Sequence, residues 1–140
     1  MTKDVLIAIR GTQHTDGEEP QVIELTTDGT LTAEDGVVTV SYRESEMTGL
    51  DGVITTFRVE NDRVILQRDG DLNSTMTFIE GEKTESLYDM GFGAMLLGVS
   101  SRRVRSDLTE KGGSLFVDYA VEIEHVPVGT NTYEITVWEP

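Results

Sequence analysis

The segment 114–124 alternates apolar and polar side chains with a period of two residues. One face carries Leu115, Val117, Tyr119, Val121 and Ile123, and the other face is mainly polar. Successive side chains of a β-strand point to opposite faces, so this pattern predicts a half-buried strand. The same alternation returns along most of the chain, and no segment shows sustained helical spacing. The sequence therefore predicts an all-β protein.

Short turn signals rich in Gly, Asn and Asp divide the chain into about ten expected strands. These strands cover residues 4–13, 21–32, 37–46, 53–60, 63–69, 74–80, 84–90, 94–106, 114–124 and 132–138. A meander of neighbouring antiparallel strands buries one face and protects both edges when it closes into a barrel. A β-sandwich is the main alternative, but its crossovers need longer connections than the segment His14–Pro20. We expect residues 1–140 to form a single domain, an antiparallel up-and-down barrel of eight to ten strands.

Three local irregularities are expected within this plan. A bulge is predicted at Asp28–Gly29, because glycine tolerates positive φ. Gly91–Gly93 is interpreted as a backbone kink between two strands, since no helix follows to make a phosphate site. Pro127–Asn131 is expected to form the turn before the last strand.

The charge is strongly acidic, with 11 basic and 26 acidic residues and a net charge of −15. Such a surface repels nucleic-acid phosphates and anionic membranes, so neither is an expected partner. The acidic residues are spread along the chain, which favours a solubilising surface over a dedicated binding patch. The chain has no cysteine, and its first apolar run, Val5–Ile9, is too short for a signal peptide. We therefore expect a cytoplasmic protein.

Motifs for catalysis and for metal or cofactor binding do not emerge from the sequence. His14 and His125 stand apart, without the spacing of a metal site, and both adjoin predicted loops. Neither a Gly-x-Ser-x-Gly elbow nor a glycine-rich phosphate loop occurs. We expect no catalytic residues, no bound metal and no cofactor, and an enzyme is the last of the hypotheses.

Arginines on otherwise apolar rows are the most informative side chains. Arg68 shares one strand face with Val64 and Leu66, and Arg103 follows Leu97, Val99 and Ser101 on another. If both rows face the lumen, a guanidinium would lie above an apolar interior and could bind a carboxylate or phosphate. Phe78, Tyr88 and Tyr119 would then line the cavity. The alternative is that Arg68 pairs with an interior acid such as Glu44, and that the apolar rows pack into a filled core.

Several short stretches, in this order and spacing, resemble one known family. They are Tyr42–Glu44, Thr55–Val59, Val64–Gly70, Ser74–Phe78, Tyr88, Gly93 and Asp118–Tyr119. The chain resembles the YwiB-like family of small bacterial proteins from about residue 4 to residue 138. The resemblance implies a lipocalin-like, calycin-type barrel in the cytoplasm, and it supplies no reaction and no catalytic residue. A fold alone does not assign a function.

Two functional hypotheses remain open at this point. The first is a barrel that binds a small hydrophobic or amphipathic anionic ligand in its lumen, with Arg68 as the anion partner. The second is a non-enzymatic interaction protein whose packed barrel forms a homodimer or binds a protein partner. The second predicts no internal cavity, and an exposed Trp138 would favour it.

Overall fold

A computed structural model describes residues 2–15, 17–45, 50–71, 73–89 and 93–140. The described chain forms ten strands and no helix. They are β1 (Thr2–His14), β2 (Gln21–Glu34), β3 (Val37–Arg43), β4 (Ile54–Val59), β5 (Val64–Asp69), β6 (Asn73–Phe78), β7 (Lys83–Asp89), β8 (Ala94–Ser106), β9 (Gly113–Ile123) and β10 (Val126–Trp138). Each expected strand overlaps one of these.

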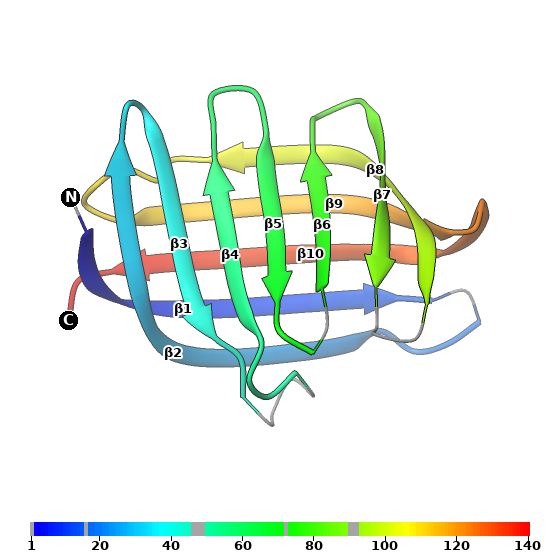
Figure 1. The fold of residues 1–140 in the computed structure, drawn as a ribbon, viewed down its shortest axis with the longest axis horizontal. Helices are drawn as coiled ribbons and strands as arrows, with labels where there is room; N and C mark the ends of the chain where they lie inside the picture. The colour runs from blue at the N-terminus through cyan, green and yellow to red at the C-terminus, as the bar shows by residue number, and fades with distance from the viewer. Residues whose placement is uncertain (1, 16, 46–49, 72, 90–92) are drawn as a thin grey trace.

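All ten strands join in one closed antiparallel barrel, in which each strand pairs with its neighbours in sequence and β1 pairs with β10. The expected all-β, up-and-down antiparallel barrel is thereby confirmed. Figure 1 shows that β3–β7 run across the direction of β1, β9 and β10, so the barrel is flattened into two crossing layers. β2 and β8 belong to both layers, since β2 pairs with β1 and β3, and β8 pairs with β7 and β9.

Gly29, where a bulge was expected, lies next to the point where β2 begins to pair with β3. The β1–β2 register continues without a shift through the pairs Leu6–Asp28 and Val5–Gly29, so the predicted bulge is wrong. Gly29 instead permits a close approach at the point where β2 begins to pair with β3. A Cβ added there would lie 2.4 Å from the carbonyl oxygen of Ser41 and 2.5 Å from Cδ1 of Ile7.

The last turn also differs from the sequence expectation. β10 begins at Val126, so Pro127–Asn131 belongs to a strand and the expected turn there is wrong. The chain reverses at Glu124 and His125, whose φ angles of 51° and 68° place both residues in the left-handed region. Both central residues of a type I′ hairpin adopt such angles. Of the expected kink at Gly91–Gly93, the first two residues lie outside the described part of the chain.

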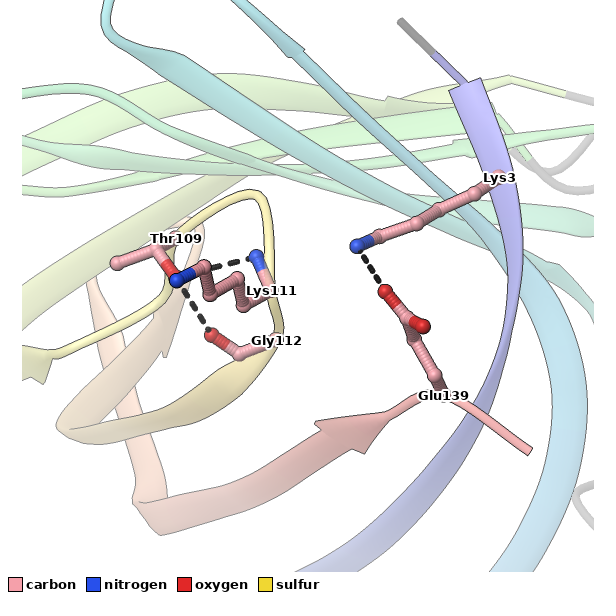
Figure 2. Close-up of polar contacts among 5 residues, drawn as sticks. All are labelled: Lys3, Thr109, Lys111, Gly112 and Glu139. Carbon is pink, nitrogen blue, oxygen red and sulfur yellow. Dashed lines mark hydrogen bonds and ion pairs between the residues drawn. The ribbon is translucent and has the colours of Figure 1, made fainter.

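Polar contacts lie near the two ends of the chain and in the neighbouring turn at Thr109–Gly112, where β1 and β10 close the barrel (Figure 2). Lys3 in β1 forms an ion pair with Glu139, just beyond β10. In the neighbouring turn, the Thr109 hydroxyl accepts a hydrogen bond from the Lys111 amide at 3.1 Å. Gly112 has a φ of +105°, and a Cβ there would lie 2.4 Å from the carbonyl oxygen of Val137. This turn therefore requires glycine.

The barrel wall is held differently between β6 and β7. Among the described residues, these strands pair at Asn73–Asp89 and Ser74–Tyr88. Farther along, hydroxyls replace the backbone ladder, because Thr84 Oγ1 donates to the Thr77 carbonyl and Ser86 Oγ donates to the Thr75 carbonyl, each at 2.5 Å. At the end of these strands where Ser74 and Tyr88 lie, each strand from β3 to β8 therefore pairs with the next through its backbone.

Candidate functional site

Three consecutive rows of lumenal side chains cross β3–β6. The two apolar rows are Val38–Val59–Val64–Phe78 and Val40–Phe57–Leu66–Met76, and all their members are buried. The third row, called the polar row here, consists of Tyr42, Thr55, Arg68, Ser74 and Tyr88, each directly opposite the next on the adjacent strand. Cross-strand neighbours of this kind have Cβ atoms about 4.5–5.5 Å apart. The row therefore brings five polar side chains into line at one end of the barrel.

Arg68 is the centre of the polar row. Its Nη2 donates a hydrogen bond of 2.8 Å to the Tyr133 hydroxyl, reaching across the lumen from β5 to β10. Its Nε is buried and has no hydrogen-bond partner among the described residues. Burial by itself lowers the pKa of Arg68, but Tyr133, Tyr42 and Glu44 together hold the pKa above its ordinary value. Arg68 is therefore a charged interior group with donor capacity to spare.

Glu44 supplies a negative charge near this guanidinium, and the direct pairing of Arg68 with Glu44 stays a prediction. Glu44 follows directly after β3 and is 4% exposed, and its Oε2 accepts a hydrogen bond of 2.5 Å from Thr55 Oγ1. Burial and the nearby charge of Glu44 raise the pKa of Tyr42, which keeps that hydroxyl protonated. The carboxylate of Glu44 is thus held by the row itself, and its charge favours the ionised form of Arg68.

Phe78 and Tyr119 lie inside the barrel as expected, but deep in its packed core. Phe78 is 0% and Tyr119 1% exposed, and their ring centroids lie 4.7 Å apart. Burial, followed by the charge of Tyr133, raises the pKa of Tyr119. The Tyr119 hydroxyl accepts a long hydrogen bond of 3.4 Å from Asn131 Nδ2. Of this pair, Tyr119 reaches the polar end of the lumen through its hydroxyl, whereas Phe78 belongs to an apolar row.

Arg103 does not line the lumen, and that expectation is wrong. The β8–β9 pairing shifts register between Ser101 and Arg103, so the inward face of β8 changes after Ser101. A one-residue slip sends all following side chains to the opposite face. Arg103 is consequently exposed, whereas Ser101 is buried and Val104 is half-buried.

Two cavities open beside the polar row. The first, called the polar chamber here, has a volume of about 140 Å³ and is lined by Arg68, Tyr42, Glu44, Tyr133 and apolar residues of β1 and β2. The second, the apolar chamber, has a volume of about 320 Å³ and is lined by Tyr88, Met95, Leu97, Val121, Ile123 and Val128, among others. Arg68 and Tyr88, both predicted as ligand-binding residues, therefore line different chambers. Both chambers are partly open to solvent beside a packed core, so the absence of an internal cavity expected for a packed barrel stays a prediction.

Sequence reasoning missed Tyr133, Asn131 and Gln13 as members of the site. Tyr133 falls within the expected last strand, 132–138, but its partner Arg68 lies 65 positions away in the chain. Gln13 and Asn131 are directly opposite each other on β1 and β10, and both line both chambers. The useful signal was the apolar alternation of β10 extended backward through Asn131, but the expected turn at Pro127–Asn131 concealed it.

The described residues contain no group of three or more His, Asp or Glu side chains placed to hold a metal ion. In the same part of the chain, no helix has the length and apolarity needed to span a bilayer. The described part of the chain places the guanidinium of Arg68, the side chains of Tyr42 and Tyr133 and the buried carboxylate of Glu44 around the polar chamber. The chemistry available there is hydrogen bonding and charge recognition.

Fold and site together define a closed ten-stranded antiparallel β-barrel with a polar row at one end of its lumen. The family model for a domain of unknown function, DUF1934, matches residues 7–135, and the chain belongs to this family. The chain is 29% identical over 134 residues to the uncharacterized β-barrel protein YwiB of Bacillus subtilis, covering 93% of this chain and 92% of that protein.

The crystal structure of the Bacillus subtilis YwiB protein has the same fold. It superposes with a TM-score of 0.76 at 23% identity, over 96% of this chain and 92% of the other. The resemblance to the YwiB-like family seen in the sequence is confirmed, and the lipocalin-like relationship stays a prediction.

Proposed function

We propose that this protein is a binding barrel for a small organic anion, with Arg68 as the group that recognises the ligand's acidic end. The observation that carries the proposal is the incomplete pairing of Arg68. Among the described residues, its guanidinium makes one hydrogen bond, to Tyr133, and its buried Nε has no acceptor. A buried donor without an acceptor costs about 1–3 kcal/mol, so an acceptor that enters the chamber is favoured.

The size of the polar chamber limits what part of a ligand it can hold. A cavity of about 140 Å³ is close to the roughly 150 Å³ cavity that accepts benzene, so about six non-hydrogen atoms fit. A carboxylate suits this space, because its two oxygens can accept hydrogen bonds from a guanidinium in a bidentate arrangement. The Tyr42 and Tyr133 hydroxyls line the same space and add neutral hydrogen-bonding groups.

Charge acts on this ligand in two ways. The net charge of −15 repels anions at long range, so affinity has to arise locally at Arg68. Inside the barrel the effective dielectric constant is lower than in water, which strengthens the contact between guanidinium and carboxylate. Glu44 opposes the ligand's charge, but its oxygen is already bonded to Thr55.

Butyrate, which has six non-hydrogen atoms, is a suitable first probe. We expect chemical-shift titration to give saturable binding that falls more than tenfold in Arg68→Ala and in Arg68→Gln. Arg58→Gln is the matched control, because Arg58 is an exposed arginine on the adjacent strand, paired with Glu60. Equal affinity of the Arg68 and Arg58 variants would refute the role of Arg68. Native mass spectrometry of the protein from its own cells, before and after unfolding, would identify the natural ligand class.

Self-association is a second candidate function, supported by the exposed end of β10. Trp138 is 38% exposed although it is a large apolar side chain in the last strand. A homodimer through this end would bury the indole, and Trp138→Ala would then shift the sedimentation coefficient from dimer to monomer. The two functions are compatible, because Trp138 lines neither chamber.

A further inference from the structure

We infer that the polar and apolar chambers form one site, and that its ligand is a linear amphipathic monocarboxylate whose acidic end lies at Arg68 and Ser74 and whose tail lies in the apolar chamber. This inference rests on the proposed function, since it places the acidic end of the same ligand at Arg68. It adds the ligand class, a second head-group residue and the location of the tail.

The wall formed by the polar row is continuous from one chamber to the other. Arg68, which lines the polar chamber, is directly opposite Ser74, and Ser74 is directly opposite Tyr88, which lines the apolar chamber. The next strand continues the line, because Tyr88 is opposite Met95. A ligand that follows this row therefore passes from charged to apolar surroundings across three neighbouring strands.

Ser74 lines neither chamber, but it is the second residue of the polar row with an unpaired polar atom. It is 5% exposed, and its Oγ is buried without a hydrogen-bond partner among the described residues. The row thus places two unpaired polar atoms, Arg68 Nε and Ser74 Oγ, on directly opposed residues. A carboxylate has two oxygens and can accept from both groups, which one neutral acceptor atom would do less well.

The partition between the chambers consists of weakly held side chains. Gln13 and Asn131 face each other across β1 and β10 and line both chambers. Gln13 is exposed, and no side-chain hydrogen bond joins it to another described residue. Asn131 is held by a 3.4 Å contact with Tyr119, at the long limit of a hydrogen bond. In the joined site, these two side chains rotate away from the boundary that the chambers share.

The apolar chamber is suited to a hydrocarbon tail. Its volume of about 320 Å³ lies in the range of about 300–1,000 Å³ for pockets that hold small molecules. Among the described residues that line it there is no charged side chain. Each methylene that moves from water into such surroundings raises affinity about threefold to fourfold.

A chain-length series tests the inference. We expect affinity to rise about 100-fold from butyrate to octanoate for the wild-type protein, measured by calorimetric titration below the micellar concentration. Val121→Phe fills part of the apolar chamber from half-buried Val121, and should remove most of that gain while leaving butyrate affinity within about twofold. Val126→Phe, at an exposed position beyond β9, is the matched control and should keep the full gain. If Val121→Phe does not fold, Met95→Trp fills the same chamber from β8.

The outcomes separate this inference from the proposed function. If butyrate binds in an Arg68-dependent manner but longer chains gain nothing, the joined site is refuted and the proposed function stands. The same conclusion follows if octanoate binds Val121→Phe as tightly as wild type. If neither acid binds, or if Arg68→Gln binds both normally, the proposed function itself fails.

Discussion

The apolar and polar rows of β3–β6 share the same strands and the same lumenal face, yet differ in chemistry. The row Val40–Phe57–Leu66–Met76 interlocks without a polar atom, and its members are 0–7% exposed. One step along the same strands, Tyr42, Thr55 and Ser74 are 0–6% exposed and surround a charged arginine. Close-packed apolar side chains would stabilise the barrel in the polar row as well as they do in the apolar rows.

The polar row therefore has a cost that the fold does not require. Buried polar groups are normally hydrogen-bonded, and a buried charge needs a partner. Here Thr55, Glu44 and Tyr133 have partners, whereas Arg68 Nε and Ser74 Oγ have none among the described residues. The apolar rows therefore hold the barrel together, whereas the unpaired atoms of the polar row belong to the end of the lumen where the proposed ligand would bind.

The largest expected effect is on the apolar side of this comparison. Leu66→Ala should lower the free energy of unfolding by about 3 kcal/mol, because it deletes fully buried methyl groups and leaves a cavity. Urea unfolding at pH 7 measures this loss. The outer-face variant Ile65→Ala is the control, with a smaller expected loss because Ile65 is half-buried. Equal losses of unfolding free energy in the two variants would mean that the apolar rows do not form the core of the barrel.

On the polar side, Arg68→Met should cost about 2 kcal/mol of unfolding free energy, even though methionine packs well. The reason is that the buried carboxylate of Glu44 loses the favourable charge near it. Adding Glu44→Gln to Arg68→Met should recover most of the loss, because the remaining row is then neutral. A double-mutant cycle over these two positions gives the coupling energy, and a coupling near zero would show that the two charges do not interact.

How far the sequence could predict this site depended on distance along the chain. The alternation of apolar residues indicated the barrel and put Arg68 on a lumenal row, because a strand's two faces follow from a period of two. It could not indicate the Arg68–Tyr133 contact, which joins strands from opposite layers. It misplaced Arg103 for a related reason, since the bulge after Ser101 arises from pairing with β9 and has no local signature such as glycine. Rows within strands were therefore predictable, whereas contacts across the lumen and a bulge set by a neighbouring strand were not.

The tyrosines predict a dependence of stability on alkaline pH. Burial raises the pKa of both Tyr42 and Tyr119, so the folded protein keeps these protons after the unfolded chain loses them near pH 10. Above that pH the folded state binds more protons than the unfolded state, so stability falls by about 1.4 kcal/mol per pH unit for each tyrosine. Urea unfolding from pH 9 to 11 should show this slope, and Tyr119→Phe should make it shallower by one tyrosine's share. An unchanged slope in that variant would contradict the assignment.

The smallest expected effect on stability belongs to Ser74, and it is the sharpest test of the comparison. Ser74→Ala removes a buried hydroxyl that has no partner, so stability should stay within about 0.5 kcal/mol of wild type or rise. Its neighbour in the same row gives the contrast, because Thr55→Val removes the hydrogen bond to Glu44 and should cost about 1–3 kcal/mol. For ligand affinity we expect the reverse order, with the larger effect from Ser74→Ala. Ser74→Ala should weaken butyrate and octanoate by the same severalfold factor, since it acts on the shared acidic end. A loss confined to octanoate would place Ser74 beside the tail, whereas a loss of stability as large as that of Thr55→Val would make it a structural residue.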